Sequence, residues 1–184
     1  MADPGHTGDV GTTHNDPEVE RTDTVLVVPA VADDGSGRLR FEQLIPDDGS
    51  LERITTYLDD RRTIGARVVV EPPMYQGVTV VARVRARRRF APDVLHDDCI
   101  RALYEYLHPT RGGPDGDGWP FGRPVHVGEV YAVLQRLPGT DIIEDARLFA
   151  ADPVTGERGE SVQRLVLDPH ALTFSYEHQV QVVS

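Results

Sequence analysis

The sequence predicts an α+β fold: a small two-layer sandwich, or two of them, built from tandem β-α-β units with a C-terminal β-hairpin. Two observations lead to this prediction. Short β-branched runs alternate twice with stretches of helical periodicity, and the first two predicted helices both end on Tyr-Leu, at Tyr57-Leu58 and Tyr106-Leu107. In addition, the last segment alternates apolar and polar residues over 172–182, as a half-exposed strand does.

The first unit is predicted over residues 23–74. In chain order it contains a buried strand over 24–31, a brief extended segment over 41–45, a helix that follows the capping residues 47–50 and ends before Gly65, and a strand over 66–71. Pro72-Pro73 ends that strand, because proline has no amide hydrogen to give to a sheet.

The second unit is predicted over residues 75–184. It contains an alternating strand over 78–89, a helix that opens at Pro92 and ends before Pro109, a Gly/Pro loop over 110–124, a helix over 127–137 and a strand over 141–150. A polar turn over 152–160 leads to the predicted hairpin, whose strands are 162–167 and 172–182 around Asp168-Pro169-His170.

Residues 1–22 are rich in Gly, Asp, Thr and Pro and are predicted to form a disordered acidic arm.

Composition excludes several classes of protein. All 19 basic residues are Arg, so no lysine chemistry is available, and the single Cys99 excludes cysteine-rich metal sites and intrachain disulfides. The net charge of −11 opposes nonspecific binding to nucleic acid or anionic membranes. The chain has no signal peptide and no membrane span, which predicts a cytoplasmic protein.

One strand carries a row of arginines. In the stretch from Val78 to Arg89, alternation places Arg83, Arg85, Arg87 and Arg89 on the face opposite the apolar residues, with Arg88 interrupting the row. Such a row either pairs with carboxylates of the same chain or binds an acidic protein surface. Nucleic acid is a poor fit, because no aromatic residues alternate with the arginines.

The Gly/Pro loop contains two large aromatic residues between prolines. The segment consists of Trp119, Pro120, Phe121, Gly122 and Arg123. Aromatic side chains in a loop either complete the core of their own domain or anchor a contact with another subunit. These five residues, with Arg83, Arg85 and Arg87, are the candidate interface residues.

Residues capable of catalysis or metal binding form no convincing constellation. His126 and Glu129, with Asp115 or Asp117, are the best set for a small hydrolase or metal-dependent enzyme. The Asp115 loop lacks the remaining calcium ligands, and Cys99 lies on the apolar stripe of a helix. The sequence therefore predicts no catalytic residues, no metal and no cofactor.

Several runs of residues, in order along the chain, resemble a known family. They are Tyr57-Leu-Asp-Asp-Arg-Arg-x-Ile-Gly65, Val68-Val-Val-Glu-Pro-Pro-x-Tyr75, Val78–Arg85, Ala102-Leu-Tyr-x-Tyr-Leu-His-Pro109, Gly112–Gly116, Gly118-Trp-Pro-Phe-Gly-Arg-Pro-Val125 and Pro138-Gly139. Together they are similar to the C-terminal part of the J-like baseplate assembly proteins of phage-tail-like contractile injection systems. The resemblance extends from Asp23 to Val182. Typical members are several times longer, with an N-terminal J-type region where this chain has the acidic arm.

The resemblance implies a structural wedge protein of the baseplate. Its partners would be other baseplate subunits, hub or spike proteins, the sheath and copies of itself in a ring, within a tail-like particle that is assembled in the cytoplasm and could be released. The family has no catalytic residues to carry over. Two alternatives remain: the small hydrolase at His126 and Glu129, and a free-standing module that binds an acidic protein through the strand Arg83–Arg89.

Overall fold

The computed structural model describes residues 21–31, 36–63 and 65–184. Its helices and strands confirm the α+β class. In chain order they are β1 (Arg21–Leu26), the 3-10 helix η1 (Phe41–Leu44), α1 (Asp48–Asp59), β2 (Ala66–Glu71), β3 (Met74–Ala86), α2 (Pro92–Tyr106), β4 (Val125–His126), α3 (Val127–Gln135), β5 (Thr140–Ala151), β6 (Arg158–Val162), β7 (Arg164–Leu165), β8 (Ala171–Ser175) and β9 (Gln179–Val183). Residues 1–20 of the predicted arm lie outside the described residues, and its last two residues begin β1.

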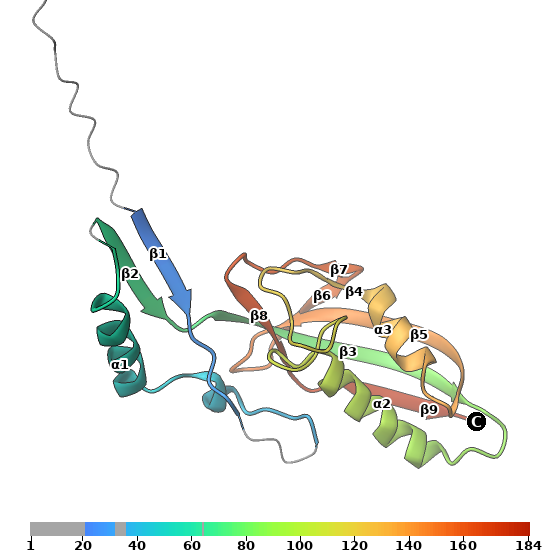
Figure 1. Ribbon diagram of the computed structural model, residues 1–184. Coiled ribbons are helices and arrows are strands. Elements are labelled where there is room, and N and C mark those ends of the chain that lie inside the picture. The colour runs from blue at the N-terminus through green and yellow to red at the C-terminus, as the bar shows by residue number, and fades with distance from the viewer. Residues whose placement is uncertain (1–20, 32–35, 64) are drawn as a thin grey trace, which may run out of the picture.

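A β-α-β unit stands at one end of the molecule, away from the larger sheet (Figure 1). β1 and β2 pair in parallel from Arg21 opposite Ala66 to Leu26 opposite Glu71, with α1 between them in sequence and packed against β2. The Asp47 side chain caps α1 by accepting a 2.9 Å hydrogen bond from the Ser50 amide. The prediction of a buried strand over 24–31 is wrong in extent and in burial, because β1 ends at Leu26 and the residues over 24–31 are exposed or half-buried.

The link between this unit's first strand and its helix contains a second departure from prediction. Residues 41–45 were expected to be extended, but Phe41–Leu44 form the 3-10 helix η1. The Gln43 side chain accepts a 2.8 Å hydrogen bond from the Arg40 amide, which closes the turn, and Leu44 is fully buried.

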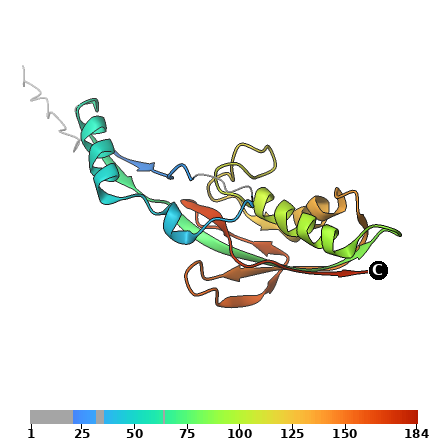
Figure 2. The same cartoon turned by 90° about the horizontal axis from the view of Figure 1, so that it is seen from below.

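The larger sheet has five strands in the order β6-β5-β3-β8, with β9 also pairing with β3. The long central strand β3 is antiparallel to β5 and parallel to β8 and β9. Helices α2 and α3 cover one face of this sheet and leave the other open (Figure 2). The alternation predicted over 78–89 is confirmed from Ala82 to Ala86, where the apolar residues are buried and Arg83 and Arg85 are exposed. Earlier in the strand it is wrong, because Val78, Thr79 and Val80 are all buried, and β3 ends at Ala86 instead of at position 89.

The predicted C-terminal hairpin is wrong. β7 pairs with β4 instead of with the strand that follows it, and β8 and β9 both pair with β3. The turn at Asp168 directs the chain onto the free edge of β3, where the long strand offers hydrogen-bonding partners along most of its length. The half-exposed alternation predicted for 172–182 is also wrong for β8, because Leu172, Thr173 and Phe174 are all buried and the strand is therefore covered on both faces.

A bulge separates β8 from β9. Val78 lies opposite Ser175 and Val81 opposite Gln179, so three steps on β3 match four on the other strand. The His178 side chain bridges the interruption, since its Nδ1 accepts a 3.1 Å hydrogen bond from the Val80 amide. In the described ranges, no helix combines the length and apolar character that crossing a bilayer requires.

Candidate functional site

The Gly/Pro loop over 110–124 is held against the body of the protein by backbone hydrogen bonds. The Gly113 amide donates to the Tyr106 carbonyl at 2.7 Å, and the Trp119 amide donates to the Pro109 carbonyl at 2.9 Å. At the other end, the Gly122 amide donates to the Ala171 carbonyl at 3.0 Å. Gly122 has a φ of 66° and contacts Pro169, so a side chain there would be strained and crowded. The loop therefore has one defined shape.

Trp119 completes the core of its own domain. Its side chain is 3% exposed and packs edge-on against Tyr106, with ring centroids 5.7 Å apart. The indole Nε1–H donates a 2.9 Å hydrogen bond to the Arg123 carbonyl, and the Arg123 guanidinium lies 4.8 Å from the ring centroid. Of the two interpretations that the sequence left open, the core interpretation describes Trp119 in this chain.

A charged network surrounds the tryptophan. Glu129 Oε1 accepts hydrogen bonds from Arg123 and from the Tyr106 hydroxyl, the latter at 3.1 Å, and Oε2 accepts a 3.0 Å hydrogen bond from the His126 amide. Burial alone would raise the pKa of Glu129, but these hydrogen bonds outweigh it and hold that pKa below its usual value. Burial, with the Glu129 charge, raises the pKa of Tyr106 to about 12. Glu129 is thus a structural carboxylate with three donors.

The outer part of the loop remains available to a partner. Phe121 is 45% exposed, and Pro120 before it is also exposed. Exposure of an aromatic ring to water is unfavourable, and burial of the ring against a partner would remove this free-energy cost. Among the five loop candidates, the structure therefore places Trp119 inside and Phe121 outside.

The arginine row over 83–87 makes contacts within the chain. Glu144 on β5 accepts from Arg83 Nε at 2.9 Å and also pairs with Arg85. Arg87 uses its Nε–H to donate a 2.9 Å hydrogen bond to the Thr140 carbonyl. Arg83 and Arg85 therefore share one carboxylate of the same chain, whereas Arg87 bonds a backbone carbonyl.

The residues considered for catalysis are separated or already engaged. Asp115 and Asp117 are exposed in the loop, and Glu129 is held by its three donors. Within the described ranges, no group of three or more His, Cys, Asp or Glu residues is arranged to hold a metal ion. Cys99 is fully buried, and burial, with the nearby charge of Asp98, raises the pKa of its thiol to about 12. It is therefore a poor nucleophile.

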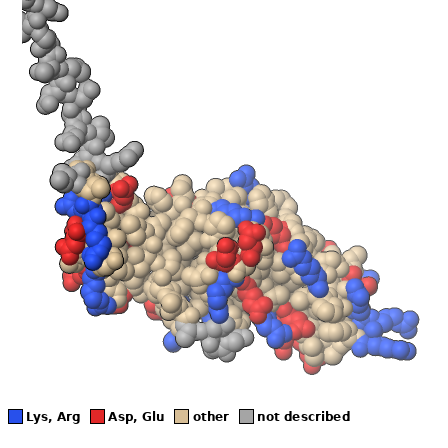
Figure 3. Space-filling model, in the orientation of Figure 1, with Lys and Arg blue, Asp and Glu red and all other residues tan. Residues whose placement is uncertain are grey.

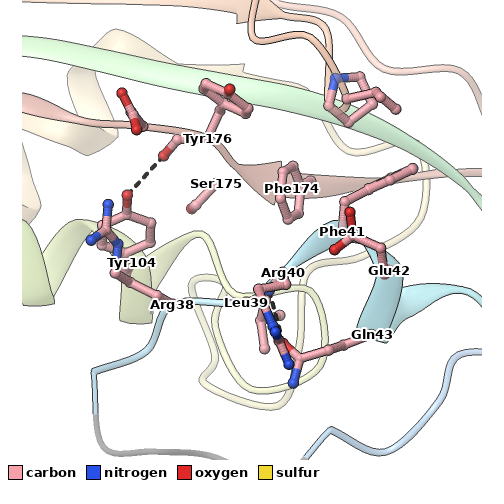
Figure 4. Close-up of a pocket in the computed structure, with 13 residues that line it drawn as sticks. Arg38, Leu39, Arg40, Phe41, Glu42, Gln43, Tyr104, Phe174, Ser175 and Tyr176 are labelled. Carbon is pink, nitrogen blue, oxygen red and sulfur yellow. Dashed lines mark hydrogen bonds between the residues drawn. The ribbon is translucent and has the colours of Figure 1, made fainter.

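The structure also contains a hollow that the sequence did not reveal. It has a volume of about 650 Å³ and lies between the segment 38–43 and the end of β8 (Figure 4). Phe41 packs edge-on against Phe174 with centroids 5.5 Å apart, and the Tyr104 hydroxyl donates a 3.0 Å hydrogen bond to the Tyr176 carbonyl. Each of these two contacts joins residues more than sixty positions apart in the sequence, and no shared sequence motif marks them.

Comparisons with known proteins identify a fold relative. No family model matches the chain, and no curated protein matches it. Among solved structures, it is similar to a chain in the cryo-EM structure of the anti-feeding prophage (AFP) baseplate, 6-fold symmetrised, with a TM-score of 0.54 and 19% sequence identity. The match covers 88% of this chain and 30% of that chain. At this identity the comparison establishes a common fold, and the present chain spans less than two thirds of its neighbour's length.

Proposed function

We propose that this chain is a structural subunit of the baseplate of a phage-tail-like contractile injection system. The observation that carries the proposal is the fold that most of the chain shares with a chain of the AFP baseplate. The residue runs quoted above support the same class independently, since they follow one another in order along nearly the whole chain.

The proposed position is that of a wedge subunit. It would join other baseplate subunits around the hub or spike, contact the sheath and meet copies of itself in a ring, with assembly in the cytoplasm. Sheet edges suit such contacts: within the described residues β1 and β2 each have one unpaired edge, and the larger sheet ends at β6 on one side and β8 on the other. Unpaired edges can accept a strand from a neighbouring subunit.

The loop around Phe121 is the proposed apolar contact. Its backbone is fixed by hydrogen bonds to Tyr106, Pro109 and Ala171, so little ordering entropy would be lost on binding. A half-exposed phenylalanine on a rigid support is a common anchor of protein interfaces.

The proposed role is non-enzymatic, and the state of the catalytic candidates supports this part of the proposal. A general base needs a carboxylate free to take a proton, whereas the lowered pKa and three donors of Glu129 stabilise its charged form. The hydrolase alternative therefore gains no support at the residues on which it depended.

The proposal can be tested in the native cells with tagged protein. Sheathed particles are purified by sedimentation from cells expressing wild-type chain, Phe121→Ala or Val154→Ala, and the tag in each particle fraction is quantified. Val154 is the matched control, because it is also an exposed apolar loop residue, at 70%.

Wild-type and Val154→Ala chains are expected in the particle fraction, and Phe121→Ala is expected to be depleted by at least about tenfold. Absence of the wild-type chain from particles would overturn the baseplate proposal. Equal incorporation of all three would leave the baseplate role standing and remove Phe121 from the interface.

A further inference from the structure

A strained turn follows β3. The Phe90 amide donates a 3.0 Å hydrogen bond to the Arg87 carbonyl, so Arg88 and Arg89 are the two central residues of a β-turn. Arg89 has a φ of 70°, and no other non-glycine residue in the described part of the chain has a positive φ. Glycine or asparagine normally occupies this position, because a Cβ is disfavoured there.

The surrounding structure imposes this conformation. The Arg87 amide donates a 2.8 Å hydrogen bond to the Gly139 carbonyl, and the Arg87 side chain donates to Thr140. On the other side of the turn, the Phe90 ring packs onto Gly139 so closely that a Cβ there would lie 2.5 Å from ring atoms. The turn is thus pinned at both ends, and glycine at position 89 would relieve the strain. Strain retained in this way points to a use for the side chain.

Among the described residues, the two arginines of the turn lack the ion pair that the arginines of β3 make. Arg83 and Arg85 share Glu144, whereas Arg88 and Arg89 are exposed and have no ion pair with any described residue. Basic side chains project from the end of the molecule where β3, β9 and the β3–α2 loop meet (Figure 3).

Three further charged residues belong to the chain segments that adjoin the turn. Arg136 is exposed in the connection that leads to Gly139, and it adds to the positive charge. Asp141 and Asp93 are exposed carboxylates at the start of β5 and of α2. The turn itself remains a pair of unneutralised guanidinium groups on a chain of net charge −11.

We propose that the Arg88–Arg89 turn docks a carboxylate-rich segment of a partner protein. Guanidinium groups bind carboxylates through two parallel hydrogen bonds, and a pinned turn presents two of them without further ordering. An acidic protein segment fits better than nucleic acid, because the neighbouring Phe90 packs on Gly139 instead of offering a face for base stacking. The inference does not depend on the baseplate proposal.

The test measures binding of the full chain to fluorescein-labelled poly-L-glutamate by fluorescence anisotropy. The wild type is expected to bind, more weakly at about 0.5 M than at about 0.05 M salt. The double variant Arg88→Glu/Arg89→Glu is expected to lose at least about tenfold in affinity. The control Arg67→Glu/Arg164→Glu makes the same change in net charge at two exposed arginines elsewhere, and should lose less than about twofold.

The variant Arg89→Gly tests whether the Arg89 side chain serves to bind a partner or to stabilise the fold. Removing the strain is expected to raise the melting temperature while weakening poly-L-glutamate binding. A lower melting temperature would show that the Arg89 side chain serves the fold and would overturn the proposal. Equal losses in the two double variants, no binding by the wild type, or tighter binding to double-stranded DNA than to poly-L-glutamate would each overturn it as well.

Discussion

Replacement of Trp119 by alanine tests whether this residue is part of the core. The side chain is 3% exposed, its ring packs against Tyr106, and its Nε1–H is bonded to the Arg123 carbonyl. Alanine would leave a cavity and an unpaired, partly buried carbonyl, and truncating a buried tryptophan costs about 3–5 kcal/mol. Because a domain of this size has a total stability of about 5–15 kcal/mol, the variant should remain mostly folded but unfold much more easily.

The assay is urea unfolding followed by far-ultraviolet circular dichroism, since the variant loses the chain's single tryptophan as a fluorophore. Phe121→Ala serves as the control, because its side chain is 45% exposed and its loss should cost less than about 1 kcal/mol. A loss below about 1 kcal/mol for Trp119→Ala would refute the reasoning, since a residue in the core cannot be removed so cheaply.

Three further predictions concern His178, Gly77 and Gly128. Burial, with the charge of Arg38, lowers the pKa of His178 from 6.5 to about 3, so the neutral imidazole stabilises the fold fully above about pH 6.5 and progressively less as the pH falls toward 3. The wild type should therefore lose about 2 kcal/mol more than His178→Asn between about pH 7 and pH 5, measured by urea unfolding; equal losses would contradict the assignment. Gly77→Ala should destabilise by about 1–3 kcal/mol, because its Cβ would lie 2.9 Å from the Ala151 carbonyl carbon. Gly128→Ala, whose Cβ would meet nothing within 4 Å, should instead stabilise α3 by about 0.5–1 kcal/mol, and urea unfolding of both glycine variants would reveal a reversal of these signs.

Local patterns predicted most single elements of the fold. The strand over 66–71 coincides with β2, and Pro92 opens α2 because proline suits the first turn of a helix. Alternation along β3 correctly divided its buried residues from its arginines. These successes rest on periodicity and on the special backbone of proline and glycine, both of which act within a few residues.

Pairing between distant segments was harder to predict. The residues of β8 and β9 read as half of a hairpin, yet their partner is β3, about a hundred residues earlier. Which strand they pair with depends on which edge of the folded sheet is unpaired, and this cannot be deduced from local sequence patterns. His178 illustrates the same limit, since its function as a hydrogen-bond acceptor for Val80 exists only at the bulge that this pairing creates.

The candidate site was predicted in part. The Gly/Pro loop was singled out for its aromatic residues, but the sequence could not decide that Trp119 points inward and Phe121 outward. The arginine row was found by alternation, whereas its pairing with Glu144 depends on the register between β3 and β5. The strained Arg89 could not be predicted, because arginine carries no sequence signal for a positive φ.

The most direct test of the baseplate proposal is to locate the chain on a particle. Sheathed particles from the native cells would be labelled with immunogold against this chain and viewed by negative-stain electron microscopy. The proposal predicts gold at the baseplate end of each sheathed tube. Gold confined to free, monomeric protein, with none on the tubes, would contradict it.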